Sequence, residues 1–204
     1  WDSSQDGSFS DYVDKIAVPQ VKEILSKYGP ISVIWWDTPQ DMTPELAAKF
    51  QEAIAVQPEI IQNSRLISSN PGDFRVFEGV IPFSGAPGTP WEACVMMNES
   101  WGYSRVHPHW ATKEKVIRQV VQTASLGGNL LLNVGPDASG SFPPEAVAIL
   151  SDLGDWMKVH GEAIYGTTAF PVKAGWQQGR FTQKPGKVFA HVFLWPSNGK
   201  LRIP

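Results

Sequence analysis

Two short runs of consecutive apolar residues constrain the fold of this 204-residue chain most strongly. The first, ISVIWW, occupies residues 31–36 between two Gly/Pro-containing turns, and the second, NLLLNVG, occupies residues 129–135. Neither run alternates apolar with polar residues, as a strand with one solvent-exposed face would. Both are therefore predicted to be strands buried on both faces, which is typical of a parallel sheet.

Helical and strand-like segments alternate along the first 160 residues. A first helix is predicted over residues 10–28, with Ser10 as its N-cap and either a kink or a later start at Pro19. The other predicted helices cover residues 43–56, 112–126 and 143–159, and the other predicted strands cover residues 59–63, 74–77 and 91–97. Thr43 and Thr112 are the expected N-caps of two of these helices. This alternation predicts an α/β fold with a parallel sheet, either open or closed.

The pattern changes after Gly161. Four strand-like segments follow, separated by Gly, Pro and Asn, and they read AIYGTTAF, GRFTQK, KVFAHVFLW and KLRI. No helical periodicity returns in this part of the chain. Residues 1–160 are therefore predicted to form an α/β domain, and residues 161–204 the start of an antiparallel, all-β domain.

Charge and hydropathy argue against two classes of partner. The formal net charge is −3, and no run of lysine and arginine reaches four residues, so we expect no nucleic-acid partner. No run of about 18 apolar residues occurs, so we expect no membrane span. Cys94 is the single cysteine, which excludes an internal disulfide and leaves the redox compartment open. Because residue 1 is Trp rather than Met, we expect the chain to begin within a longer or processed protein.

The chain contains nine tryptophans, and two of them directly precede an aspartate at the end of a predicted strand. An indole can bury its apolar face in a core, or can stack on the C–H face of a sugar ring. In parallel α/β folds the active site lies at the carboxyl ends of the strands. We therefore expect Trp35 and Trp36 to wall a pocket into which Asp37 points.

Glycoside cleavage normally requires a second carboxyl group. Glu78 and Glu99 both follow predicted strands, and their positions alone leave the choice between them open. Glu92 lies near the start of its strand and is less suited to be the acid. The alternative for each glutamate is a solvated or arginine-paired loop carboxylate.

Several segments, taken in order, resemble the α-L-fucosidases of glycoside hydrolase family 29. The resemblance runs from about residue 9 to residue 204 and rests on GPISVIWWDTP, QNSR, GDFRVFE, WEACVMMNESWGY, TASLGGNLLLNVGPDASGSFP and HGEAIYGT. It implies a (β/α)8-like barrel followed by a β-sandwich. Residues 1–160 would then be the C-terminal portion of the barrel, and residues 161–204 the start of the sandwich. It also implies a retaining enzyme that removes terminal α-L-fucose from oligosaccharides or glycoconjugates.

The resemblance further implies roles for the matching residues. Asp37 matches the nucleophile, and Glu78, in GDFRVFE, matches the general acid/base of a double displacement. The residues expected to bind the substrate are Trp35, Trp36, Arg65, Glu92 and Trp101. No cofactor or metal is expected, because the two histidines of HPHW lack a third ligand nearby.

A complete barrel needs eight strand–helix units in about 250 residues, whereas only about four such units fit before residue 160. A partial barrel exposes sheet edges, so we expect a homo-oligomer or association with the missing barrel half rather than an active monomer. An inactive fragment, a module that only binds sugar, and a different retaining hexosidase remain alternatives. The resemblance implies a secreted, periplasmic or lysosomal setting.

Overall fold

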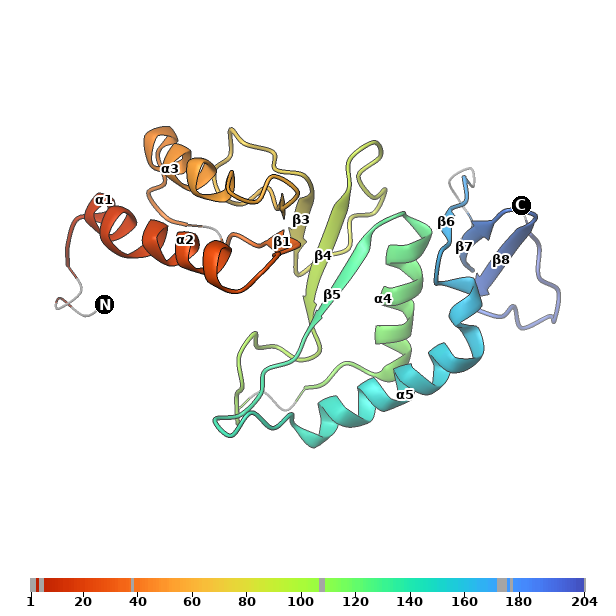
Figure 1. Cartoon of the computed structure of the whole chain (residues 1–204). Coiled ribbons are helices and arrows are strands. Elements are labelled where there is room, and N and C mark those ends of the chain that lie inside the picture. Colours follow the sequence, from red (N-terminus) through yellow and green to blue (C-terminus); the bar gives the residue numbers. More distant parts are fainter. Residues whose placement is uncertain are drawn as a thin grey trace. The chain divides into compact units, whose positions relative to one another are not determined.

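The computed structural model in Figure 1 describes residues 3, 6–37, 39–106, 109–171, 176 and 178–203. The chain divides into two compact units, residues 1–76 and residues 77–204.

The first predicted helix consists of three consecutive helical segments. These are α1 (Phe9–Tyr12), the π-helical turn η2 (Val13–Ala17) and α2 (Val18–Lys27). The N-cap is Ser8, whose hydroxyl accepts a hydrogen bond from the Asp11 N–H at 3.2 Å, so the prediction of Ser10 was wrong. The π turn ends just before Pro19. A proline ring clashes with the carbonyl four residues back, so an α-helix cannot continue unchanged through Pro19. The helix widens into a π turn here, in which the Val18 N–H donates to the Val13 carbonyl. This turn accounts for the kink that was predicted at Pro19.

Helix α3 (Pro44–Ile54) and two short strands complete the first unit. Thr43 is confirmed as the N-cap of α3, since its hydroxyl accepts from the Leu46 N–H at 3.3 Å. The strands β1 (Val33–Ile34) and β2 (Ile61–Gln62) are parallel, and Val33 pairs with Ile61. Both of these paired side chains are exposed, so the expected burial on both faces was wrong for this unit.

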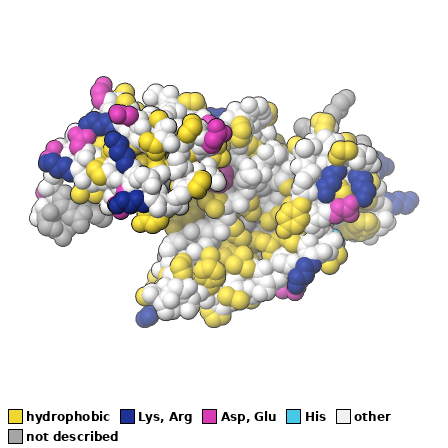
Figure 2. Space-filling view, viewed as in Figure 1, with side chains coloured by type: hydrophobic (Ala, Val, Ile, Leu, Met, Phe, Trp, Pro, Cys, Tyr) yellow, Lys and Arg dark blue, Asp and Glu magenta, His cyan; other side chains and the backbone are white. Residues whose placement is uncertain are grey.

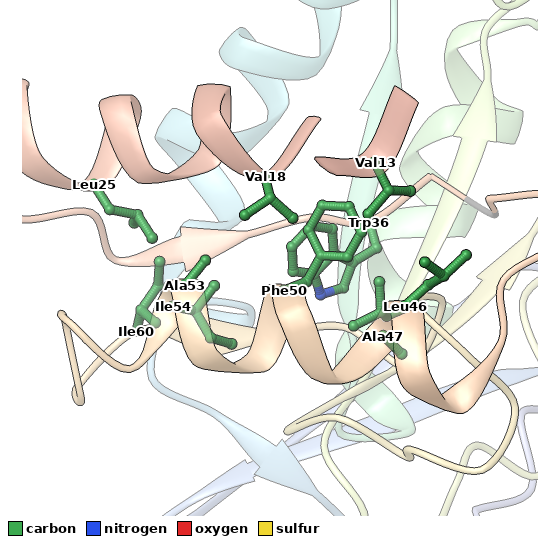
Figure 3. Packing of buried hydrophobic residues seen from close by; sticks show 11 residues of the cluster. Val13, Val18, Leu25, Trp36, Leu46, Ala47, Phe50, Ala53, Ile54 and Ile60 are labelled. Atoms are coloured by element: carbon green, nitrogen blue, oxygen red, sulfur yellow. The ribbon is translucent and has the colours of Figure 1, made fainter. Parts of the chain in front are cut away.

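The core of the first unit lies between its two helical layers. Figure 3 shows Val13 and Val18 facing Phe50 of α3, with the indole of Trp36 between them. The Trp36 and Phe50 rings meet edge to face, with their centroids 5.4 Å apart. Burying each large apolar side chain of this kind stabilises the unit by roughly 1.5–3 kcal/mol.

The second unit carries β4, β5 and the end of β3, a strand that spans the boundary at residue 76, and these strands form a sheet in the order β3-β4-β5. Its strands are β3 (Arg75–Glu78), β4 (Trp91–Met96) and β5 (Asn129–Asn133), and β4 and β5 pair in parallel from Glu92–Asn129 to Met96–Asn133. Helix α4 (Lys113–Ser125) connects these two strands and is capped by Thr112, as predicted, at 3.2 Å from the Lys115 N–H. Strand β4 is almost fully buried, whereas Asn129 and Leu131 of β5 are exposed, so the prediction that residues 129–135 are buried on both faces was wrong as well.

After β5 the second unit changes from helix to antiparallel sheet. Helix α5 (Pro144–His160) and the 3-10 turn η3 (Gly161–Ala163) precede β6 (Thr168–Ala169), β7 (Gly179–Lys184) and β8 (Lys187–Val192). Strands β6, β7 and β8 form one antiparallel sheet in sequence order. The predicted strand at KLRI was wrong, because residues 200–203 form no strand.

The observed elements place the chain among mixed α/β proteins with parallel strands followed by an antiparallel sheet. The predicted domain boundary at residue 160 coincides with the end of α5, whereas the compact units divide at residue 76. The domain boundary at residue 160 therefore stays a prediction. Within the described part of the chain, no helix combines the length and apolarity needed to cross a membrane. Hydrophobic side chains reach the surface at many points of the face shown in Figure 2.

Candidate active site

The segment Trp35–Asp37 follows β1 directly, and its three side chains differ in burial. Trp36 turns into the core, where it is buried against Phe50 and donates its indole N–H to the Gln62 side-chain oxygen at 3.1 Å. Asp37 is exposed, with 83% of its side chain accessible. The structure therefore argues against Trp36 as a wall of a sugar pocket, because its indole is a core side chain.

Asn63 holds the end of β1 beside the end of β2. Its side-chain oxygen accepts from the Trp36 N–H at 3.1 Å, and its side-chain nitrogen donates to the Trp36 carbonyl at 2.9 Å. Asn63 is only 1% exposed, and its oxygen also accepts from the Arg65 N–H at 3.3 Å. One buried amide thus fixes the backbone on both sides of the candidate site. Sequence reasoning missed this role, although an Asn at the end of a predicted strand is the signal that could have revealed it.

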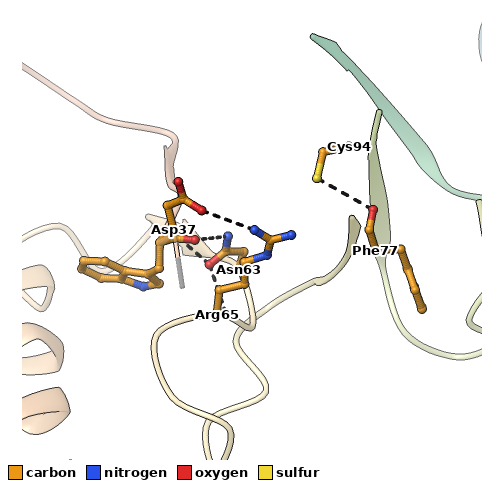
Figure 4. A network of polar contacts seen from close by, with 6 residues as sticks. Asp37, Asn63, Arg65, Phe77 and Cys94 are labelled. Atoms are coloured by element: carbon orange, nitrogen blue, oxygen red, sulfur yellow. Dashed lines mark hydrogen bonds and ion pairs between the residues drawn. The ribbon is translucent and has the colours of Figure 1, made fainter. Parts of the chain in front are cut away.

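Arg65 brings together two of the predicted site residues. Its guanidinium carbon lies 4.7 Å from the centre of the Trp35 ring, and its Nη1 lies 3.4 Å from Asp37 Oδ1 (Figure 4). The Arg65 side chain is only 11% exposed, so this cation is held within the unit rather than extended into water. The result is an exposed carboxylate at a strand end, with a fixed positive charge and an indole plane beside it.

Glu78 is the last residue of β3, and its side chain is exposed. The turn that follows is fastened to β4, because the Gly79 N–H donates to the Cys94 carbonyl at 2.8 Å. The Cys94 thiol in turn donates to the Phe77 carbonyl at 3.8 Å (Figure 4). Asp37 and Glu78 belong to different units, and the expected separation of about 5–5.5 Å between their carboxyl groups stays a prediction.

The other predicted residues of the second unit lie at opposite ends of β4. Glu92 is half-buried near the amino end, opposite Asn129, whereas Trp101 follows the carboxyl end and is 39% exposed. Five residues of strand, about 16 Å, separate Glu92 from Met97 at the carboxyl end. Active sites of parallel sheets lie at that end, so the position of Glu92 argues against the expected substrate contact.

Glu99, the other candidate acid, lies in the same loop as Trp101. Its carboxylate is 3.6 Å from Nδ1 of His109, and both side chains are exposed. His107, the first histidine of HPHW, lies outside the described residues. Among the residues that are described, no cluster of three or more His, Cys, Asp or Glu side chains is arranged to hold a metal ion.

Comparison with known proteins gives a consistent result. The family model described as alpha-L-fucosidase matches residues 1–162. Tissue alpha-L-fucosidase of Macaca fascicularis is 30% identical over 94% of this chain and 44% of its own length. Alpha-L-fucosidase isoenzyme 1 from Paenibacillus thiaminolyticus is 34% identical, with a TM-score of 0.83 over 92% of this chain and 48% of that one.

A third relative is informative about chemistry. An alpha-L-fucosidase GH29 from Bacteroides thetaiotaomicron, 26% identical, superposes with a TM-score of 0.79 over 93% of this chain and 49% of that one. That structure is described as a trapped covalent intermediate in complex with 2-fluoro-fucosyl fluoride, obtained with a Glu-to-Gln mutant. The present chain spans about half the length of the relatives it matches.

The fold, the exposed carboxylate at a strand end and these relatives define a chain of the glycoside hydrolase class. More specifically, the family model covers well over half of the sequence, and the chain belongs to the α-L-fucosidase family, GH29.

Proposed function

We propose that this chain carries the catalytic part of a retaining exo-glycosidase that removes terminal α-L-fucose from glycans. The observation that carries the proposal is the grouping of Asp37, Arg65 and Trp35 at the end of β1. A double displacement requires a carboxylate that can reach the anomeric carbon and a second carboxyl group, here Asp37 and Glu78, whereas binding alone has no need of such a pair.

The first step is attack on the fucoside by Asp37. One carboxylate oxygen forms a bond to the anomeric carbon while the glycosidic C–O bond breaks, and Glu78 gives its proton to the departing oxygen. The exposed position of Asp37 allows a sugar to approach. The Trp35 indole beside it provides an apolar plane suited to the C–H groups and the methyl group of a 6-deoxy sugar.

The second step reverses the charge changes of the first. Glu78, now ionised, takes a proton from water, the water oxygen attacks the anomeric carbon, and the ester bond to Asp37 breaks. Negative charge therefore leaves Asp37 in the first step and returns to it in the second. The Arg65 guanidinium, 3.4 Å away, stabilises the carboxylate as it leaves. Two inversions at the same carbon yield retention of configuration.

We further propose that residues 1–160 form the C-terminal portion of a (β/α)8-like barrel and that residues 161–204 begin a β-sandwich. The parallel pairing of β4 and β5 across helix α4 and the antiparallel sheet β6-β7-β8 support this division. The family match also ends near the proposed boundary, at residue 162. Exposed apolar side chains on the parallel strands, such as Val33, Ile61 and Leu131, are those that a closed barrel would pack in its interior.

A mechanism-based probe tests the nucleophile. We would incubate the chain with 2-fluoro-fucosyl fluoride and measure its mass, together with the variants Asp37→Asn and Asp41→Asn. Asp41 is the matched control because it is an exposed aspartate in the same connection, with a backbone conformation, φ 55°, that asparagine tolerates. We expect one fucosyl adduct on the unmodified chain and on Asp41→Asn, and none on Asp37→Asn.

Hydrolysis of a panel of aryl glycosides separates the remaining alternatives. Turnover of an aryl α-L-fucoside, lost in Asp37→Ala, supports the proposed enzyme. Turnover of another sugar alone would contradict the fucose assignment. Binding of L-fucose by a folded chain that forms no adduct and hydrolyses nothing would favour the sugar-binding alternative, and neither binding nor turnover would favour an inactive fragment.

A further inference from the structure

The loop of residues 98–105 follows the carboxyl end of β4 and carries Trp101. The neighbouring strand β5 ends in the motif NVG, residues 133–135, to which the proposed reaction assigns no role. Both segments belong to the second unit, and Asn133 pairs in register with Met96, close to the start of the loop. The end of β5 therefore lies where its side chains can hold the backbone of this loop in place.

Asn133 holds the loop at Trp101, one of the residues expected to bind the substrate. Its side-chain nitrogen donates to the Trp101 carbonyl at 2.7 Å, across 32 residues of sequence. Asparagine is unfavourable in strands, so its presence at a strand end calls for a compensating contact. Asn129, at the other end of β5, makes the equivalent contact with the Trp91 carbonyl at 3.3 Å, away from the candidate site.

Gly135 permits the loop backbone to lie directly against the strand end. A Cβ atom at this position would fall closer than 3.0 Å to backbone atoms of Gly102 and Tyr103. These are backbone atoms, so no side-chain rotation can relieve the clash. The φ of Gly135 is not in the left-handed region, and the glycine is therefore required for space rather than for conformation.

These two contacts fix three consecutive loop residues while leaving the Trp101 indole 39% exposed. The same loop forms one side of a cavity of about 370 Å³, which Tyr103, Arg105 and Trp110 line together with Gly135. Trp101 is not among the described residues that line this cavity, whose wall also carries Asp137 and Glu145, so the sugar contact of Trp101 rests on its partly exposed ring and on the proposed function.

We infer that Asn133 and Gly135 are positioning residues, which hold the loop of residues 98–105 so that Trp101 presents its ring to the sugar. The inference rests on the proposed function for the identity of the ligand, but the clamp itself rests on contacts within the second unit. The apolar face of the ring receives the C–H face of the sugar, and the hydrogen bond from Asn133 determines where that ring stands. Asn133 acts through Trp101 and does not touch the reacting atoms.

The clamp is tested by hydrogen–deuterium exchange of the amides of residues 98–105. The variant Asn133→Asp keeps the side-chain shape but removes the donor, and Asn129→Asp is the matched control at the other end of the strand. Loss of one hydrogen bond of this kind predicts roughly tenfold faster exchange in the loop for Asn133→Asp. Asn129→Asp should leave exchange in this loop unchanged, and unchanged exchange in Asn133→Asp would overturn the clamp.

The positioning role is tested by a double-mutant cycle on L-fucose affinity. We expect Asn133→Asp to weaken L-fucose binding several-fold in the unmodified chain and to have no further effect in Trp101→Ala, because the two residues act in series. Gly135→Ala should weaken L-fucose binding in the same way, because it also displaces the loop. In aryl-fucoside turnover, both variants should raise KM and leave kcat unchanged. Equal effects of Asn133→Asp with and without Trp101 would overturn the positioning role.

Failure of the proposed function gives a different pattern of results. If the unmodified chain binds no L-fucose, the sugar-binding part of the inference falls together with the proposed function. Faster loop exchange in Asn133→Asp would then still support the clamp, and its absence would overturn the clamp alone.

Discussion

Three consecutive residues at the end of β1 have three different environments. Trp35 contacts the Arg65 guanidinium, Trp36 is buried in the core, and Asp37 is exposed. The core residue Trp36 thus lies between two residues of the candidate site. The predicted sugar pocket stays a prediction, and Trp35 is the tryptophan that stands beside Asp37 and Arg65 to form its wall.

The buried amide of Asn63 should be essential for the stability of the first unit. In Asn63→Leu the Trp36 N–H and carbonyl would both lose their partner in a buried place, at a cost of about 1–3 kcal/mol for each group. We therefore expect the free energy of unfolding in urea to fall by about 2–6 kcal/mol. Asn198→Ala, which removes an exposed contact to the Lys200 N–H, should change it by less than about 1 kcal/mol.

At the scale of helices, the local signals in the sequence were reliable where they involve neighbouring residues. Thr43 and Thr112 both cap the helices that follow them, because the hydroxyl reaches an N–H three residues on. The start of the first helix was predicted wrongly because both Ser8 and Ser10 have suitable side chains. The backbone decides between them, since Ser8 is extended and Ser10 lies within α1.

An exposed glycine within α5 offers a stabilising substitution. Gly154 has open space around its Cβ position and is not in a left-handed conformation. Glycine is less favourable than alanine in a helix by about 0.8–1 kcal/mol, so Gly154→Ala should raise the free energy of unfolding by nearly that amount. Gly140→Ala, at φ 85°, has equal space but a strained backbone, and it should be destabilising. A thermal unfolding comparison in which both variants behaved alike would contradict this account.

The antiparallel sheet should lose stability in mild acid through His191. Burial lowers the pKa of His191 below its ordinary value of 6.5, and the nearby His160 lowers it further. The unfolded chain then binds more protons than the folded chain as the pH falls below about 6.5, so folding is favoured above that pH and weakened below it. His191 Nε2 lies 3.0 Å from the Thr182 hydroxyl, which itself donates to the Ala163 carbonyl, so a neutral ring with its proton on Nε2 fits this site.

Unfolding measured between pH 5.5 and 7.5 checks this expectation. The loss of stability at the acidic end should be reduced in His191→Gln. The exposed His109 makes a suitable control, and His109→Gln should retain the full pH dependence. An unchanged profile in His191→Gln would show that another group is responsible.

At the scale of the whole molecule, the parallel strands expose apolar side chains that such strands normally bury. Val33, Ile61 and Leu131 are all roughly half exposed, although each lies in a parallel pair. Parallel sheets are covered on both faces in known folds, so these positions indicate surfaces that another layer of protein should cover. Exposed apolar strands also favour association between chains.

We therefore expect the isolated chain to self-associate or to bind the complementary part of a barrel. Sedimentation at micromolar concentrations should give a mass above that of the 22.5 kDa chain. Threonine at Val33, Ile61 and Leu131 should shift the distribution toward the monomer, because it retains β-propensity and lowers the apolar area. Threonine at the exposed Val159 of α5 makes a comparison outside the sheets. A stable monomer with full fucosidase turnover would contradict the expectation.

The sequence by itself determined the features that depend on neighbouring residues. These include the alternation of strands and helices, two of the helix caps, the change to antiparallel strands near residue 160, and the position of Asp37 after an apolar run. Each follows from periodicity, backbone preference or a side chain reaching a few residues along the chain. The ordered segments of the α-L-fucosidase resemblance were likewise readable before any coordinates.

Only the tertiary structure decided which side chains meet. The contacts of Asn63 with Trp36 and of Asn133 with Trp101 join residues 27 and 32 positions apart, and no local pattern encodes them. The same holds for the burial of Trp36 and for the contact of Arg65 with both Trp35 and Asp37. Local chemistry specifies what each segment becomes, whereas packing between distant segments selects the residues that form the site.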